Sequence, residues 1–165
     1  MQLLLEELSH IVAEEYRQYE ALFAATQAEQ TSLVAGDTDG LDRSLGEIQG
    51  QLGRAESLAR RRQMILAKIA EDTNVPSQLL TLTRLAEMST GMTALRLERL
   101  AKDFSELMAK LHRMNGTNLL LIRNSMDMND RTVRLILGET GQVHFYGEAG
   151  MAERSADPKV LSRRI

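Results

Sequence analysis

The sequence predicts an all-α fold: an elongated antiparallel bundle of three long helices plus one short helix, with a mobile C-terminal tail. Apolar residues recur in alternating steps of three and four along most of the chain, as on the buried face of a helix. The 165 residues include only 2 Pro, 3 Tyr and 3 Phe and no Trp, which is poor in the residues that sheets favour. A chain of this length fits one domain. We therefore expect a helical bundle domain over residues 1–138 and a flexible tail over residues 139–165.

The first long helix is expected over Gln2–Ala35, where seam residues follow the three-four stepping. Glu15 falls on this seam, but we interpret it, like other scattered carboxylates, as solvent-facing. Gly36 can adopt the left-handed conformation that ends a helix, and Asp37, Thr38 or Asp39 can cap the next one. The tight turn predicts that the second helix folds back antiparallel to the first.

The second helix repeats the same stepping. Its expected seam consists of Leu41, Leu45, Ile48, Leu52, Ala55, Ala59, Arg62, Leu66 and Ile69. Gly46, Gly50 and Gly53 lie near one side, where they either admit another helix closely or are tolerated weak spots of about 1 kcal/mol each. The run Arg60–Arg62 is interpreted as a solvated face.

A short helix is expected over about 77–88, because Pro76 suits the first turn of a helix. The last helix is expected over about 92–138 and keeps a heptad-like stepping, which favours near-parallel packing. Its seam consists of Leu97, Leu100, Phe104, Leu107, Leu111, Met114, Asn118, Leu121, Ser125, Met128, Thr132 and Leu135. From the lengths of the helices, we expect the first two to stop covering the last one near residue 126, so that its apolar end overhangs.

Composition argues against several classes of function. The net charge is -3 with both signs well mixed, so a nucleic-acid partner is not expected. The chain has no Cys and therefore no disulfide framework. Its start has no basic segment before the apolar run, and no apolar run approaches the roughly 20 residues that cross a bilayer. We expect neither a signal peptide nor membrane insertion.

No residue pattern predicts catalysis, a cofactor or a metal site. Glu7-x-x-His10 matches half of a di-iron bundle signature, but the residue three before His112 is Ala109, so the second half is missing. No Gly-rich phosphate loop follows a strand, and no nucleophile has a recognisable catalytic setting. The sequence therefore predicts a protein that is not an enzyme.

The apolar excess between Leu119 and Leu137 is the candidate functional feature. Four consecutive apolar residues, 119–122, surround the helix, so one buried face cannot hold them all. Such a helix is either clamped on both sides, by the short helix 77–88 or by a homodimer partner, or it offers a surface to a partner's amphipathic helix. Tyr146, in a Gly-rich tail, either folds back onto an apolar patch or anchors a second partner.

Two segments carry a resemblance to a known family. The pattern Asn115-x-x-Asn118-x-x-Leu121-Ile122-x-x-Ser125-Met126, followed by Phe145-Tyr146-Gly147-Glu148-Ala149-Gly150, resembles the FlgN family of flagellar export chaperones. The similarity spans roughly residues 10–150 and is specific in the last helix and the tail. The extension after Gly150 is not explained by the pattern.

The resemblance implies a cytoplasmic, non-catalytic helical protein that holds the hook–filament junction proteins FlgK and FlgL by their C-terminal helical segments. It also implies that Tyr146 and Gly147 dock on the export gate protein FlhA. The client-binding residues expected on the last helix are Asn118, Leu119, Ile122, Met126, Val133, Ile136 and Leu137.

Three alternatives stay open from the sequence. The last helix could pair with itself in a structural coiled-coil homodimer without a client. The chain could also be a chaperone of another flagellar substrate, such as the filament cap, or a regulator that binds a transcription factor through the same helix.

Overall fold

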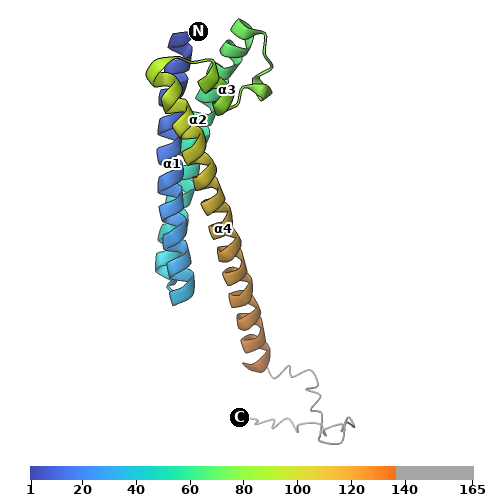
Figure 1. Cartoon of the computed structure of the whole chain (residues 1–165). Coiled ribbons are helices and arrows are strands. Elements are labelled where there is room, and N and C mark those ends of the chain that lie inside the picture. The colour runs from blue at the N-terminus through green and yellow to red at the C-terminus, as the bar shows by residue number, and fades with distance from the viewer. Residues whose placement is uncertain (137–165) are drawn as a thin grey trace, which may run out of the picture. The chain divides into compact units, whose positions relative to one another are not determined.

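The computed structural model describes residues 1–136, and every regular element among them is helical. The elements are α1 (Gln2–Ala35), α2 (Thr38–Thr73), the 3-10 turn η1 (Ser77–Leu79), α3 (Leu82–Glu87) and α4 (Gly91–Ile136) (Figure 1). The prediction of three long helices and one short helix is confirmed. The tail expected over 139–165 lies outside the described residues. The chain divides after Asn124 into two compact units, which are described separately below.

In the first unit, residues 1–124, a tight turn joins α1 to α2. Gly36 has a φ of 68°, in the left-handed region that glycine tolerates, and its N–H donates to the carbonyl of Leu33 at 3.4 Å. The Asp37 side chain accepts a hydrogen bond from the Gly40 N–H at 3.0 Å and so caps α2. The two helices consequently lie side by side and antiparallel, as predicted (Figure 1).

The portion of α4 in the first unit runs in the same direction as α1. Gln2 is hydrogen-bonded to Thr93 near the start of both helices, and Asn118 is hydrogen-bonded to Thr26 much farther along them. Between these points the ring of Phe104 packs edge-on against Tyr16 and Tyr19, with ring centroids 5.3 and 5.7 Å apart. The helices α1, α2 and α4 therefore form one bundle with a shared core.

The core is densest at the end of the bundle where the chain begins. It joins side chains of all four helices and of the segment after η1, namely Leu5, Leu8, Ile11, Val12, Ile65, Ile69, Leu80, Leu85, Leu97 and Leu100. A smaller cluster of Leu22, Leu107 and Leu111 continues it along α1 and α4. These positions of α4 follow the predicted heptad stepping.

The expected seam of α2 was correct at most positions and wrong at two. Ile48, Ala55, Arg62 and Ile69 face the bundle, but Leu45 and Leu52 are exposed. Their places on the buried stripe are taken by residues one position earlier, Ser44 and Gln51, and the same shift makes Leu58 and Ile65 part of the core. Residues three and four positions along a helix both lie on the same side, so the three-four stepping alone does not select between them.

The three glycines of α2 admit no close neighbour from another helix. A Cβ at Gly46 or Gly53 would meet nothing within 4 Å, and one at Gly50 would meet only the side chain of Arg54 from its own helix, at 3.7 Å. All three glycines are exposed. Among the described residues the structure therefore favours tolerated weak spots over a helix contact.

The predicted short helix over 77–88 proves to be two pieces. After the 3-10 turn the backbone leaves the helical conformation at Leu80, whose side chain is buried in the core. The Thr81 hydroxyl then accepts a hydrogen bond from the Arg84 N–H at 3.2 Å and caps α3. Burial of Leu80 and the new cap explain why one continuous helix does not form.

Glu15 corrects the prediction that the scattered carboxylates face solvent. It is only 4% exposed, and Arg62 of α2 reaches it with Nε at 2.8 Å from Oε2 and Nη2 at 3.4 Å from Oε1. Arg62 is likewise not part of a solvated face, although Arg60 and Arg61 are exposed as expected. A buried carboxylate is tolerated here because the guanidinium binds both of its oxygens.

Candidate functional site

The last buried residue of α4 is Asn118, the first of the expected client-binding residues. It is 3% exposed, and its Nδ2 donates to the carbonyl of Thr26 at 3.1 Å and to Oε2 of Glu29 at 2.8 Å. Its Oδ1 is buried and finds no hydrogen-bond partner among the described residues. The amide of Asn118 is thus used inside the bundle, where it ties α4 to α1. Its partner Glu29 lies on the three-four seam expected for the first helix, but the sequence did not indicate the bond between the two side chains.

The apolar run that follows Asn118 is only partly covered within the first unit. Leu119 and Leu120 are exposed, whereas Leu121 and Ile122 are half-buried. Of the candidate client-binding residues in this unit, Leu119 is open to solvent and Ile122 is partly open.

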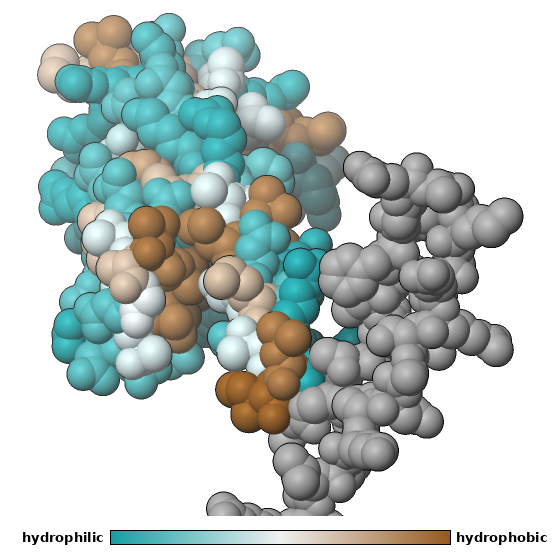
Figure 2. All heavy atoms as spheres, turned by 90° about the horizontal axis from the view of Figure 1, so that it is seen from below, coloured by the Kyte–Doolittle hydropathy of each residue, from teal (hydrophilic) through white to brown (hydrophobic). Residues whose placement is uncertain are grey.

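In the second unit, the described residues 125–136 are all exposed. They include the candidate residues Met126, at 63% exposure, Val133, and Ile136, at 79%, as well as Met128 and Leu135. Viewed from below, Figure 2 displays brown hydrophobic atoms at the surface among teal hydrophilic ones. Large exposed apolar patches are typical of surfaces that bind other proteins. Leu137, Tyr146 and Gly147, the other candidate residues, lie outside the described residues.

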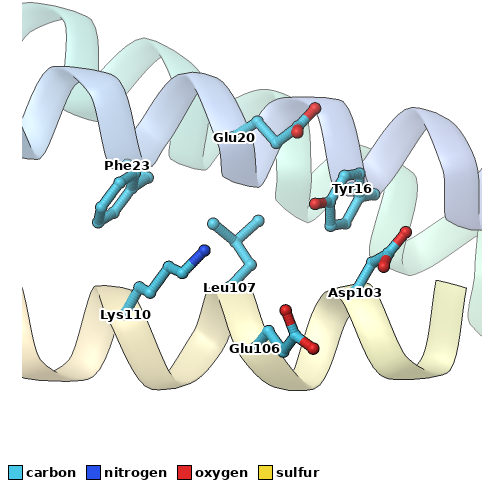
Figure 3. A pocket seen from close by; sticks show the side chains of 7 residues that line it. All are labelled: Tyr16, Glu20, Phe23, Asp103, Glu106, Leu107 and Lys110. Carbon is cyan, nitrogen blue, oxygen red and sulfur yellow. The ribbon is translucent and has the colours of Figure 1, made fainter.

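A groove between α1 and α4 forms a second notable surface, wholly inside the first unit. Its first hollow, of about 280 Å³, is lined by Tyr16, Glu20 and Phe23 of α1 and by Asp103, Glu106, Leu107 and Lys110 of α4. Figure 3 shows these side chains, with Leu107 rising between the two helices. A second hollow of about 280 Å³ shares Phe23 and Lys110 with the first and adds Gln30, Arg113, Met114 and Thr117.

The first hollow has a negative electrostatic character. Partial burial of the Tyr16 ring raises the pKa of its hydroxyl, and the nearby carboxylates of Glu20, Asp103 and Glu106 raise it further. The phenolate anion would lose its hydrating water and lie close to other negative charges, so the hydroxyl keeps its proton to a higher pH. The sequence alone did not indicate this groove, although Tyr16 and Phe23 are seven residues apart and so lie on one side of the first helix.

The described residues offer no metal centre and no membrane-crossing helix. No group of three or more His, Asp or Glu side chains within residues 1–136 is arranged to hold a metal ion. In the same range, no helix combines the length and the apolar character needed to cross a bilayer.

Comparison with known proteins identifies the family. Residues 1–154 match the family model described as FlgN protein, which covers nearly the whole chain. Neither the curated proteins nor the solved structures contain a match. The family is one of chaperones and not of enzymes. The family match agrees with the helical bundle and with the exposed apolar side chains of α4. The chain therefore belongs to the FlgN family of flagellar export chaperones.

Proposed function

We propose that this protein binds the C-terminal helical segments of FlgK and FlgL in the cytoplasm and delivers them to the export gate protein FlhA. The observation that carries the proposal is the exposure of apolar side chains along α4 after Asn118, up to the end of the described residues. The proposed client surface consists of Leu119, Ile122, Met126, Val133, Ile136 and Leu137. Asn118 is left out of it, because its side chain is already bonded to α1.

The chemistry of this surface suits temporary binding. An amphipathic client helix would cover the apolar side chains of α4, and the client's own assembly surface would be hidden in return. Met side chains adapt to differently shaped partners because they are unbranched and flexible. With apolar contacts and few buried charges, we expect a dissociation constant on the order of μM, which allows release at the gate.

The test is a binding titration of the whole chain with the C-terminal segments of FlgK and FlgL. Replacing Met126, Val133 and Ile136 together by Ser should weaken binding by at least about tenfold, since each loses buried apolar area. All three side chains are exposed, so circular dichroism should be unchanged.

The matched control replaces Met64, Met92 and Leu95 by Ser. These residues are as exposed as the first set, at 61%, 76% and 61%, but lie elsewhere on the bundle. The control should bind both segments normally. Equal affinity of the two triple variants would show that the client surface has been placed wrongly.

Gate docking is tested separately with Tyr146→Ala. This variant should bind FlgK normally and bind FlhA more weakly. Loss of both activities would contradict the proposed division between α4 and the segment around Tyr146 and Gly147.

The same titrations separate the alternatives. Preference for the C-terminal segment of the filament cap over those of FlgK and FlgL would make the cap the client. Light scattering that finds a dimer unaffected by any of these segments would favour a homodimer held by α4.

A further inference from the structure

We propose that the groove between α1 and α4 is a second docking site, and that its occupant is an amphipathic helix of a partner protein. This helix carries two apolar anchors seven residues apart, with a basic side chain beside one anchor and an acidic side chain beside the other. The site is independent of the client surface proposed above.

The dimensions of the groove fit side chains of a docked helix. Each hollow has a volume of about 280 Å³, slightly below the roughly 300–1,000 Å³ of pockets for whole small ligands. On α4 the first hollow extends from Asp103 to Lys110 and the second from Lys110 to Thr117. Their centres are thus about seven residues, or about 10 Å, apart along the helix. Side chains at positions i and i+7 of a partner helix have this spacing and share one face.

The walls of the groove supply the apolar contact that such anchors need. Leu107 is buried at its floor, while Phe23 and Met114 are half-buried and Tyr16 lines the opposite end from Thr117. Phe23 and Lys110 line both hollows and therefore lie where the two meet. A helix lying in the groove would pass over Phe23 and Lys110 and place one anchor in each hollow.

The charges of the two hollows are opposite, and this determines the charges of the occupant. Three carboxylates, of Glu20, Asp103 and Glu106, line the first hollow and outnumber its one cationic side chain, that of Lys110. The charged residues of the second are Lys110 and Arg113. Asp103 has a long contact of 3.6 Å to Arg99, whose side chain is almost fully exposed and can move away. A basic side chain on the partner fits the first hollow and an acidic one fits the second.

The groove and the client surface lie on different sides of α4. Leu119 follows Lys110 by nine residues, which is two and a half helical turns and places the two side chains on roughly opposite faces. Binding in the groove therefore leaves the client surface of this unit open. A partner in the groove and a client on α4 can bind at the same time.

The experiment uses the full chain and three synthetic helical peptides with identical apolar faces. One peptide has a basic residue beside the first anchor and an acidic residue beside the second, one has basic residues at both places, and one has acidic residues at both. Each contains one Trp, whose fluorescence reports on the peptide alone because the chain has none. The peptide of mixed charge should bind at least about tenfold more tightly than the other two.

A charge-reversed variant, Glu20→Lys with Glu106→Lys, makes both hollows basic. Its preference should move to the peptide with two acidic residues. The matched control, Glu47→Lys with Glu98→Lys, changes the net charge equally at exposed residues that do not line the groove. It should keep the preference of the natural chain.

Several outcomes would overturn the proposal. They are equal binding of the three peptides, an unchanged preference in the groove variant, or the same change of preference in the control. Titration with the FlgK segment separates this proposal from the chaperone function. The groove variant should bind that segment normally, and a loss of that binding would contradict the independence of the two sites.

Discussion

At the scale of single residues, Glu15 and Arg62 form an ion pair in which the carboxylate is buried. Both lie on seam positions of neighbouring antiparallel helices, and this shared feature was the signal in the sequence that could have revealed the pair. From the three-four stepping alone, the side chain of a charged residue on the seam is expected to face solvent. The stepping cannot report that a guanidinium from the next helix is within 2.8 Å of the carboxylate.

Arg62→Ala should lower the free energy of unfolding by about 2–4 kcal/mol, because it leaves the Glu15 carboxylate buried without its partner. Urea denaturation measures this change. Arg61→Ala is the control: Arg61 is exposed, and its loss should cost no more than about 0.5 kcal/mol. Equal effects of the two substitutions would mean that the ion pair adds no stability.

Tyr16 should make stability sensitive to alkaline pH. Its pKa is raised in the folded chain from an ordinary value of 10.0, mainly by burial and then by the carboxylates of Glu20 and Asp103. Above pH 10 the unfolded chain therefore loses this proton first, so stability is fully present below that pH and falls as the pH rises through the folded pKa.

Tyr16→Phe keeps the ring that packs against Phe104 and removes the titrating hydroxyl. The variant should lose less unfolding free energy than the natural chain between about pH 9 and pH 11. Urea denaturation at several pH values in this range measures the difference. An equally steep loss in the variant would assign the alkaline sensitivity to other groups.

At the scale of elements, some features could be predicted from the residues of a single turn, and others could not. The end of α1 and the cap of α2 were predictable because Gly36 and Asp37 act within their own turn. The seam of α2 was predictable only to within one residue at Leu45, because Ser44 and Leu45 are neighbours and the three-four stepping does not choose between them. The break at Leu80 had no local signal strong enough to outweigh the helical spacing of the surrounding leucines.

Two glycines of α2, Gly40 beside the turn and Gly53 in the middle of the helix, give substitutions of opposite sign. A Cβ at Gly40 would collide with the Asp37 carboxylate and the Ser32 hydroxyl, so the capping side chain would have to move. Gly40→Ala should therefore destabilise the protein by about 1 kcal/mol, the usual contribution of a cap. Gly53→Ala meets open space and should stabilise it by up to about 1 kcal/mol. Thermal unfolding measures both changes, and a shift of the same sign in both variants would contradict the account of the turn.

At the scale of the whole molecule, the sequence indicated where the client surface should be sought but not the groove. An excess of apolar residues along one helix is visible in one segment, as at Leu119 and Met126. The groove depends on Tyr16 of α1 and Asp103 of α4 lying side by side, and their separation in sequence hides that pairing until the helices are packed.

A chain ending at Asn124 should unfold at nearly the same temperature as the full chain. The core clusters lie entirely within residues 1–124, whereas the described residues 125–136 are all exposed and bury no core. Calorimetry of the two chains measures the difference, which should be within about 3 °C, as for a change below 1 kcal/mol. A large drop in melting temperature would mean that the later residues stabilise the bundle.

The buried Oδ1 of Asn118 makes the contact between α1 and α4 uneven along its length. Near Leu97 the two helices are joined by apolar side chains of the core. Near Asn118 an amide oxygen has lost its hydration without gaining a hydrogen-bond donor from the described residues, which costs free energy. Brief separation of the helices would hydrate this oxygen. The contact should therefore open first at Asn118, and the opening should spread toward Leu97. Among the core residues of the two helices, amide hydrogen exchange should accordingly be faster near Thr26 and Asn118 than near Leu8 and Leu97.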